Sequence, residues 1–173
     1  MNIHVSRTVS SCFSVLRQLR SIRRSVMRPV LQSLVVSLVL PRLDYGNATL
    51  AGLRGRELSR LQSVLNSAAR LIFAASNYDH VTPLLCDLHW LRVPERINFK
   101  IAVLVYRSLH GPAPAYLSTE LQNVKDMPSR QRLRLWFSET LAVPTSRLST
   151  VGDRAFPVIA ARVWNALPVD VIS

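Results

Sequence analysis

Residues 54–75 are Arg54-Gly-Arg-Glu-Leu-Ser-Arg-Leu-Gln-Ser-Val-Leu-Asn-Ser-Ala-Ala-Arg-Leu-Ile-Phe-Ala-Ala75. Apolar residues recur here at steps of three and four, the spacing that places side chains on one face of an α-helix. The pattern persists for about five turns of 3.6 residues. Its members are Leu58, Leu61, Leu65, Ala68, Leu71 or Ile72, and Ala75. The sequence therefore predicts a long amphipathic helix, whose small residues allow another helix to approach closely.

Two further helices are predicted upstream. The residues from Val5 to Ile22 repeat apolar side chains at helical spacing, and Pro29 suits the first position of a second helix. The body of that second helix, Val30 to Leu40, is too short an apolar run to span a bilayer, and we expect it to be buried. If the first helix continues past Ile22, one stripe of it carries Arg17, Arg20, Arg24 and Arg28.

Downstream, prolines mark helix starts. Thr82-Pro83 predicts a short helix over Leu84 to Leu88, with threonine as the cap. A longer helix follows Pro94 and ends before Gly111. Since its segment Ile97 to Leu109 is apolar on more than one side, we expect it to be the central, most buried helix.

The C-terminal third loses this periodicity. Residues 118–149 are polar and charged, which predicts a linker or mobile loop, and residues 150–173 regain a helical pattern that predicts a docking helix. Residues 1–117 are expected to form a helical bundle. The fold class is all-α: an irregular bundle of about five to seven helices with a loop-rich stretch in the C-terminal third.

Composition points to a polyanionic partner. The 173 residues include 22 Lys+Arg against 10 Asp+Glu, a net charge of +12, and 49% are hydrophobic. Lys100 and Lys125 are the only lysines, so nearly all of the positive charge is guanidinium, which binds phosphate through a planar fork and stacks on bases. The alternative is that the arginines merely cover solvated helix faces.

Three groups of arginines are candidate nucleic-acid-binding residues. Each lies within one short segment, and the last group precedes Trp136-Phe137. Arginines beside exposed aromatic side chains suit single strands or A-form hybrids. The alternative places these two aromatics in the core. The candidates are Arg17, Arg20, Arg23, Arg24 and Arg28; Arg54, Arg56 and Arg60; and Arg130, Arg132 and Arg134.

No catalytic or metal site is predicted. Polymerase chemistry needs paired carboxylates for two Mg²⁺ ions, and the sequence contains no Asp-Asp. Asp44 is interpreted as a structural carboxylate that orients a helix junction through arginine and backbone N–H groups. His80, Cys86, Asp87 and His89 do not have the spacing of a zinc knuckle. Two distant cysteines, with no secretory signal, favour an intracellular protein, nuclear or cytoplasmic, with no membrane partner.

Four sequence blocks carry a family resemblance. The last is Thr150-Val-Gly-Asp-Arg-Ala-Phe-Pro-Val-Ile-Ala-Ala-Arg-Val-Trp-Asn-Ala-Leu-Pro168, and the others are Leu40 to Asn47, Leu61 to Leu71 and Thr82 to Pro94. In this order they resemble the region after the polymerase palm in non-LTR (LINE-type, Jockey-superfamily) retrotransposon reverse transcriptases. The resemblance implies a thumb and connector segment of an RNA-directed DNA polymerase whose Mg²⁺-dependent palm, like its endonuclease, lies outside this chain.

The expected function is therefore non-catalytic. The resemblance and the arginines together predict a fragment of a transposable-element protein that clamps template and primer. Its expected partners are RNA or an RNA–DNA hybrid and the missing palm, and no cofactor is expected in this chain. The alternative is an orphaned helical protein-interaction module with no nucleic-acid role, because helices built to pack on an absent palm leave an apolar patch exposed.

Overall fold

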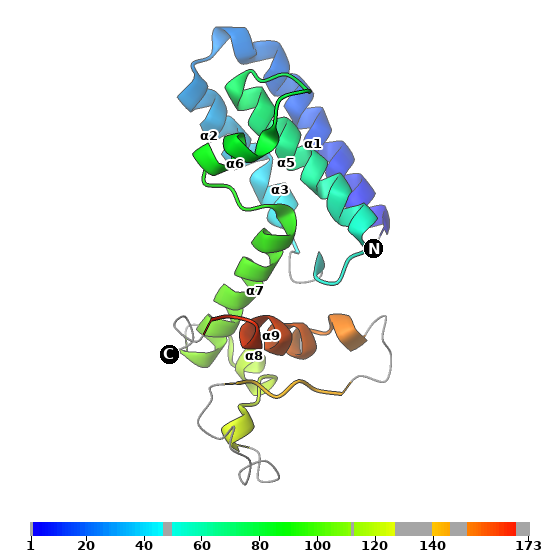
Figure 1. Cartoon of the computed structure of the whole chain (residues 1–173), viewed down its shortest axis with the longest axis vertical. Helices are drawn as coiled ribbons and strands as arrows, with labels where there is room; N and C mark the ends of the chain where they lie inside the picture. Colours follow the sequence, from blue (N-terminus) through cyan, green and yellow to red (C-terminus); the bar gives the residue numbers. More distant parts are fainter. Residues whose placement is uncertain (1, 47–49, 112, 127–139, 146–151, 169–173) are drawn as a thin grey trace. The chain divides into compact units, whose positions relative to one another are not determined.

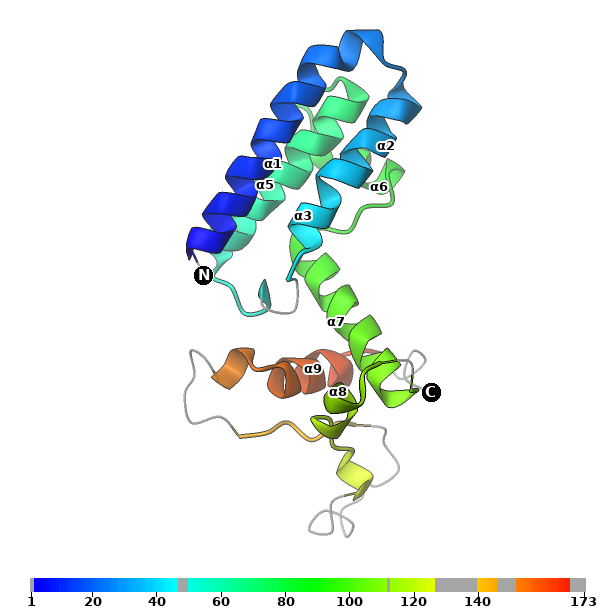
Figure 2. The same cartoon turned by 180° about the vertical axis from the view of Figure 1, so that it is seen from behind.

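The computed structural model describes residues 2–46, 50–111, 113–126, 140–145 and 152–168 (Figures 1 and 2). These residues form α-helices and short 3₁₀ turns, with one isolated antiparallel bridge and no strand among them. The predicted all-α fold class is confirmed. The chain divides into two compact units, each described by itself below: unit 1 comprises Met1–Asn47 and Leu53–Arg96, and unit 2 comprises Ala48–Gly52 and Ile97–Ser173.

Unit 1 is a helical bundle. In chain order it contains α1 (Asn2–Ile22), the 3₁₀ turn η1 (Arg23–Ser25), α2 (Arg28–Leu38), α3 (Leu40–Asp44), α5 (Gly55–Phe73), α6 (Val81–Asp87) and the first turn of α7 (Val93–Leu109). Helix α1 lies along α5, and α2 packs against both (Figures 1 and 2). Helix α6 packs on α5 as well, so α5 is the helix that most of the unit surrounds.

Helix α5 confirms the prediction made from residues 54–75. Its buried face follows the predicted spacing and comprises Leu61, Val64, Leu65, Ala68, Ala69, Leu71 and Ile72. A fully buried leucine contributes about 1.5–3 kcal/mol relative to an exposed one. Ala68 and Ala69 have no exposed surface, as expected where another helix approaches closely. The helix ends at Ala74, whose φ of 61° is left-handed.

The first helix does not continue past Ile22, so the expected single stripe of arginines is wrong. After η1 the backbone is extended at Val26 and Met27, and α2 starts at Arg28. Pro29 explains the break, because it has no N–H to donate to a carbonyl four residues earlier. Arg17 and Arg20 therefore lie on α1, Arg28 on α2, and Arg23 and Arg24 on the turn between them.

The apolar run Val30 to Leu40 is half-buried rather than buried throughout. Leu31, Val35 and Val39 are enclosed, whereas Val30, Val36 and Leu38 are each more than 40% exposed. Only one face of this segment therefore packs against neighbouring helices. Among the described residues, none of the helices combines the length and the apolar character that a membrane span requires.

The division between the units falls inside α7, which differs from the boundary expected at residue 117. The part of α7 in unit 2 is buried along one side only, at Ile97, Ile101, Val105 and Ser108. Phe99 is 56% exposed. The expectation that this is the central, most buried helix is therefore wrong, because α5 has more buried residues and the apolar residues of α7 exceed what one packing face can cover.

Unit 2 also contains α8 (Ala115–Thr119), the 3₁₀ turns η2 (Val124–Asp126) and η4 (Gly152–Arg154), and α9 (Phe156–Asn165). Pro157 is accommodated in the first turn of α9, and Trp164 is its largest buried side chain. The predicted C-terminal helix is thus present. Its buried residues, Val158, Ile159, Ala160, Ala161 and Trp164, supply a large part of the unit's apolar core.

The described part of residues 118–149 is more ordered than a linker. Leu121, Val124 and Leu141 are buried, and Asn123 and Leu141 form the antiparallel bridge. The side-chain amide of Asn165 donates to the Leu141 carbonyl and its oxygen accepts from the Leu141 N–H, each at 2.9 Å. Both polar groups of a buried residue are therefore paired, which holds this extended piece in the core.

Candidate nucleic-acid interface

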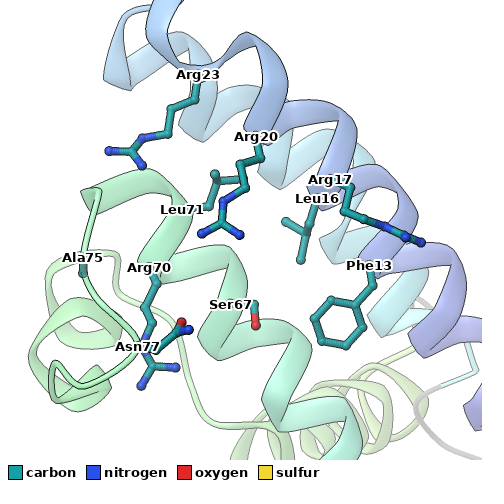
Figure 3. Close-up of a pocket in the computed structure, with 10 residues that line it drawn as sticks. All are labelled: Phe13, Leu16, Arg17, Arg20, Arg23, Ser67, Arg70, Leu71, Ala75 and Asn77. Atoms are coloured by element: carbon teal, nitrogen blue, oxygen red, sulfur yellow. The ribbon is translucent and has the colours of Figure 1, made fainter.

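A small pocket in unit 1 is lined by four arginines and by no acidic residue (Figure 3). It lies where the C-terminal part of α1 meets the C-terminal part of α5, and its volume is about 140 Å³. Arg17, Arg20 and Arg23 come from α1 and η1, and Arg70 comes from α5. The remaining lining residues are Phe13, Leu16, Ser67, Leu71, Ala75 and Asn77.

Helical spacing explains why three of these arginines share the pocket. Arg17, Arg20 and Arg23 follow one another at steps of three, so Arg17 and Arg20 project from neighbouring turns on one side of α1 and Arg23 follows them at the start of η1. The buried Leu16 and Leu71 form apolar surface beneath them. Long arginine stems can cover such surface while the guanidinium groups stay in water. The pocket thus combines an apolar floor with a positively charged rim.

Arg70 holds the loop that closes one side of the pocket. Its Nη2 donates to the Asp79 carbonyl at 3.1 Å, and its own carbonyl accepts from the Ala75 N–H at 3.0 Å. The Asp79 carboxylate accepts from the Ser76 N–H at 2.7 Å. The Nε of Arg70 is buried and has no hydrogen-bond partner within the described part of the chain. A buried N–H donor without an acceptor is costly.

Sequence reasoning missed Arg70. The available signal was its position between Ala69 and Leu71, both on the buried face of α5, since an arginine rarely lies there without a specific role. The expected junction arginines are only partly brought together: Arg17, Arg20 and Arg23 line the pocket, whereas Arg24 is exposed elsewhere. The Arg28 guanidinium lies 3.9 Å from the centroid of the Phe73 ring, a cation–π contact.

The second group of candidates lies at the opposite end of α5. Arg54 directly precedes the helix, Arg56 is in its first turn, and both are exposed. Arg60 donates from Nη1 to the Ser6 hydroxyl at 2.9 Å. These three residues therefore do not contribute to the pocket. Arg130, Arg132 and Arg134, with Trp136 and Phe137, lie outside the described residues.

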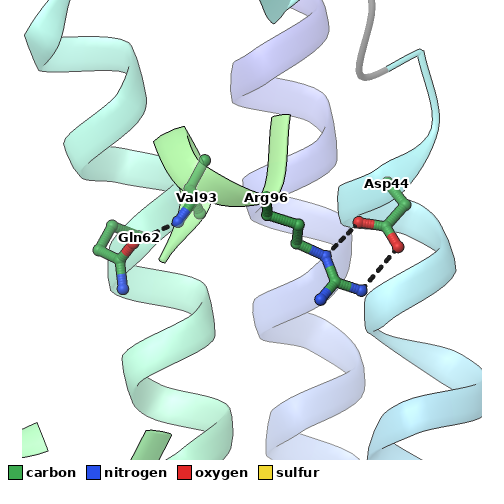
Figure 4. A network of polar contacts seen from close by, with 4 residues as sticks. All are labelled: Asp44, Gln62, Val93 and Arg96. Atoms are coloured by element: carbon green, nitrogen blue, oxygen red, sulfur yellow. Dashed lines mark hydrogen bonds and ion pairs between the residues drawn. The ribbon is translucent and has the colours of Figure 1, made fainter. Parts of the chain in front are cut away.

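Asp44 lies in an ion pair (Figure 4). Its carboxylate accepts from Arg96 Nε at 2.5 Å and from Arg96 Nη2 at 2.7 Å, and both side chains are just over four-fifths buried. Nearby, the Gln62 side-chain oxygen accepts from the Val93 N–H at 2.8 Å. Asp44 thus joins the end of α3 to the start of α7, in keeping with its interpretation as a structural carboxylate. Its partner is Arg96 and not the adjacent Arg42, which donates to the Ser11 hydroxyl.

The residues considered for a metal lie around the end of α6. Cys86, Asp87 and His89 are all exposed, and His89 adopts a left-handed φ of 54°. The His89 N–H donates to the Cys86 carbonyl at 2.9 Å, and the Trp90 N–H donates to the Leu85 carbonyl at 2.8 Å. The His89 backbone therefore closes the helix end. In the described ranges, no three His, Cys, Asp or Glu side chains converge as metal ligands would.

Comparison of the chain with protein-family models, with curated proteins and with solved structures finds no match. The chemistry available at the pocket is recognition of an anion by guanidinium groups, because its lining offers donors and positive charge without a carboxylate.

Proposed function

We propose that this chain is a non-catalytic nucleic-acid-binding segment of a retrotransposon reverse transcriptase, which clamps template and primer. The observation that carries the proposal is the pocket of four arginines without an acidic lining residue. The sequence resemblance to the region after a reverse-transcriptase palm supports the same reading of the charge. RNA and an RNA–DNA hybrid are the proposed ligands.

Guanidinium groups on a helix bind the phosphate backbone without reading sequence. Each phosphate contact releases about one counterion, so affinity falls with salt at a logarithmic slope of about 0.7–0.9 per contact. Arg17, Arg20 and Arg23 lie within two turns of one another, a spacing over which they can contact neighbouring phosphates of one strand. The binding is expected to be strong at low salt and similar for unrelated sequences.

The test compares two triple variants that remove the same charge. Arg17→Gln/Arg20→Gln/Arg23→Gln should weaken binding to a labelled RNA–DNA hybrid and lower the salt slope by about 2–3 units, because three phosphate contacts are lost. Arg54→Gln/Arg56→Gln/Arg60→Gln, at the other end of α5, should change both much less. Equal losses in the two variants would mean that only net charge matters, and a parent with no salt dependence would contradict the proposal.

The proposal assigns no catalytic role to the chain. Primer extension on an RNA template in the presence of Mg²⁺ is therefore expected to give no product. A product that depends on this chain, in a preparation free of other polymerases, would overturn this part of the proposal.

A second candidate function, protein interaction, is favoured by exposed aromatic side chains on α7. Phe99 and Tyr106 are each more than half exposed, and the Tyr106 ring stacks on His110 with 4.0 Å between centroids. Apolar association persists or strengthens as salt rises, whereas phosphate binding weakens. Self-association or partner binding that grows with salt and is lost in Phe99→Ser would support this second function.

A further inference from the structure

We propose that the arginine pocket of unit 1 holds a terminal phosphate monoester of a nucleic-acid strand, in preference to an internal phosphodiester. The inference rests on the proposed function, since it names the part of the nucleic acid that this surface takes. It is carried by three properties of the pocket: its size, its uncompensated charge and a buried donor without an acceptor.

The pocket is small. Its volume of about 140 Å³ is well below the roughly 300–1,000 Å³ of pockets that enclose a drug-sized ligand. A phosphate group fits such a space, whereas a whole nucleotide does not. A chain end can insert its phosphate and leave the rest of the strand outside, but an internal phosphodiester carries a nucleoside on each side that must also approach the walls.

The charge of the pocket favours the monoester. A phosphate monoester carries about −1.5 to −2 at neutral pH, against −1 for a diester, and offers three terminal oxygens. Arg20 and Arg23 line the pocket from α1 and η1, and Arg70 lines it from α5. The closest acidic residue in the adjoining loop, Asp79, does not line the pocket, and its carboxylate accepts from the Ser76 N–H.

Arg70 lines the pocket, and its Nε–H is an unsatisfied donor in the described part of the chain. It is buried and has no partner among the residues the structure describes, while Nη2 of the same side chain is already bound to the Asp79 carbonyl. In the proposed complex the Arg70 side chain shifts so that this donor meets a phosphate oxygen, which removes the cost of leaving it unsatisfied. Ser67 and Asn77 add neutral hydrogen-bonding groups around the same space (Figure 3).

The apolar part of the lining suits the nucleoside that follows the phosphate. Phe13 is half-buried on α1 and lies on the other side of Ser67 from Asn77 in the view of Figure 3. An aromatic ring beside a phosphate site offers a stacking surface for a terminal base, whatever its identity. The pocket therefore fits a strand end without requiring a particular sequence.

The experiment measures binding of the full chain to short single strands that differ only at one end: phosphate, hydroxyl or methyl phosphate diester, placed at the 5′ or the 3′ terminus. For at least one terminus, the phosphate form should bind about tenfold more tightly than both others, the effect of one further charge-assisted hydrogen bond. Arg20→Gln/Arg23→Gln should bring this ratio close to one. The matched control Arg54→Gln/Arg56→Gln should leave the ratio unchanged.

Arg70→Lys tests the buried donor separately, because lysine keeps the charge but has no Nε–H in that position. It should also reduce the ratio, with circular dichroism showing a folded chain. A ratio of one in the parent, with all strands bound, would overturn this inference and leave the proposed function standing. A ratio that survives Arg20→Gln/Arg23→Gln would place the preference elsewhere and also overturn it.

Two further outcomes separate the sources of phosphate. If no strand binds in any form, the proposed function fails and this inference fails with it. If inorganic phosphate raises the melting temperature while the strands show no end preference, the pocket takes free phosphate and the assignment to a nucleic-acid end is wrong.

Discussion

The carboxylate of Asp44 and the guanidinium of Arg96 form a two-point hydrogen-bonded pair across 52 residues of sequence. Helix α3 ends at Asp44, and Arg96 lies in the first turn of α7. A planar guanidinium accepts only a narrow range of carboxylate orientations, so the pair holds the first turn of α7 against the end of α3.

Asp44→Asn should destabilise unit 1 by about 1–3 kcal/mol, because Arg96 then keeps its charge in a largely enclosed place without a charged partner. Urea unfolding measures the change. Asp87→Asn, an exposed carboxylate on α6, is the control and should be close to neutral. The double variant Asp44→Asn/Arg96→Gln should recover part of the loss, and strictly additive effects would show that the pair is not coupled.

Leu65→Ala should cost about 2–5 kcal/mol, because Leu65 is fully buried on α5 and its removal leaves a cavity. Leu104→Ala removes the same atoms from a half-buried position on α7 and should cost clearly less. Thermal unfolding of the parent and the two variants measures the effect of the same substitution at a fully buried and at a half-buried position. Equal losses would contradict the assignment of the buried face of α7 to Ile101 and Val105.

Asn165→Ala should destabilise unit 2 by about 1–3 kcal/mol, since it leaves the buried N–H and carbonyl of Leu141 without their partner. Asn165→Asp keeps an acceptor for the Leu141 N–H but removes the donor to the Leu141 carbonyl. Its stability should therefore lie between those of the parent and of Asn165→Ala. Amide hydrogen exchange at Leu141 reports the contact directly. Asn98→Ala, at an exposed position of α7, is the matched control; protection that survives in Asn165→Ala would contradict the assignment.

Cys12 should remain an unreactive thiol in the folded chain. Burial on α1 raises its pKa above the ordinary value of 9.0, and the nearby Arg42 charge lowers it by less. Because the folded pKa exceeds the unfolded one, this thiol adds stability that is fully present below about pH 9 and is lost as pH rises through the folded pKa. The melting temperature of the parent should therefore fall more steeply above that pH than that of Cys12→Ala.

Thiol labelling supplies the control for this prediction. Cys86 is exposed and should react quickly under native conditions, whereas Cys12 should react only when the chain opens. Rapid native labelling of Cys12 would contradict the burial on which the pH prediction depends.

The sequence predicted the helices better than it predicted which of their faces are buried and which residues contact one another. Helix α5 was recoverable because a single apolar face repeats over its whole length. The sequence did not orient helix α7, because it has apolar residues on several sides, and only the packing decides that Val105 is buried and Leu104 half-buried. Leu141 is only 2% exposed, although no apolar periodicity surrounds it in the sequence. Its burial results from contacts with residues distant in the sequence, which the local pattern does not reveal.

The candidate site divides in the same way. Arg17, Arg20 and Arg23 were found because they are clustered in the sequence. Arg70 was missed because its neighbours in the pocket come from another helix, and the Asp44 partner was missed because Arg96 lies far along the chain. Steps of three or four residues are visible in a sequence, whereas contacts between distant segments depend on the completed packing.

Because a protein is synthesised from its N-terminus, the hydrogen bonds between the Asn165 amide and Leu141 form late. Leu50 and Ala51 also belong to unit 2, so its earliest residues leave the ribosome long before its last helix does. All described helical segments of unit 1 have been synthesised once Arg96 has emerged from the ribosome. The core of unit 2 is complete only after Asn165 has emerged. Until Asn165 is synthesised, Leu141 lacks its amide partner, and the nascent second unit is the part of the chain that chaperones would encounter.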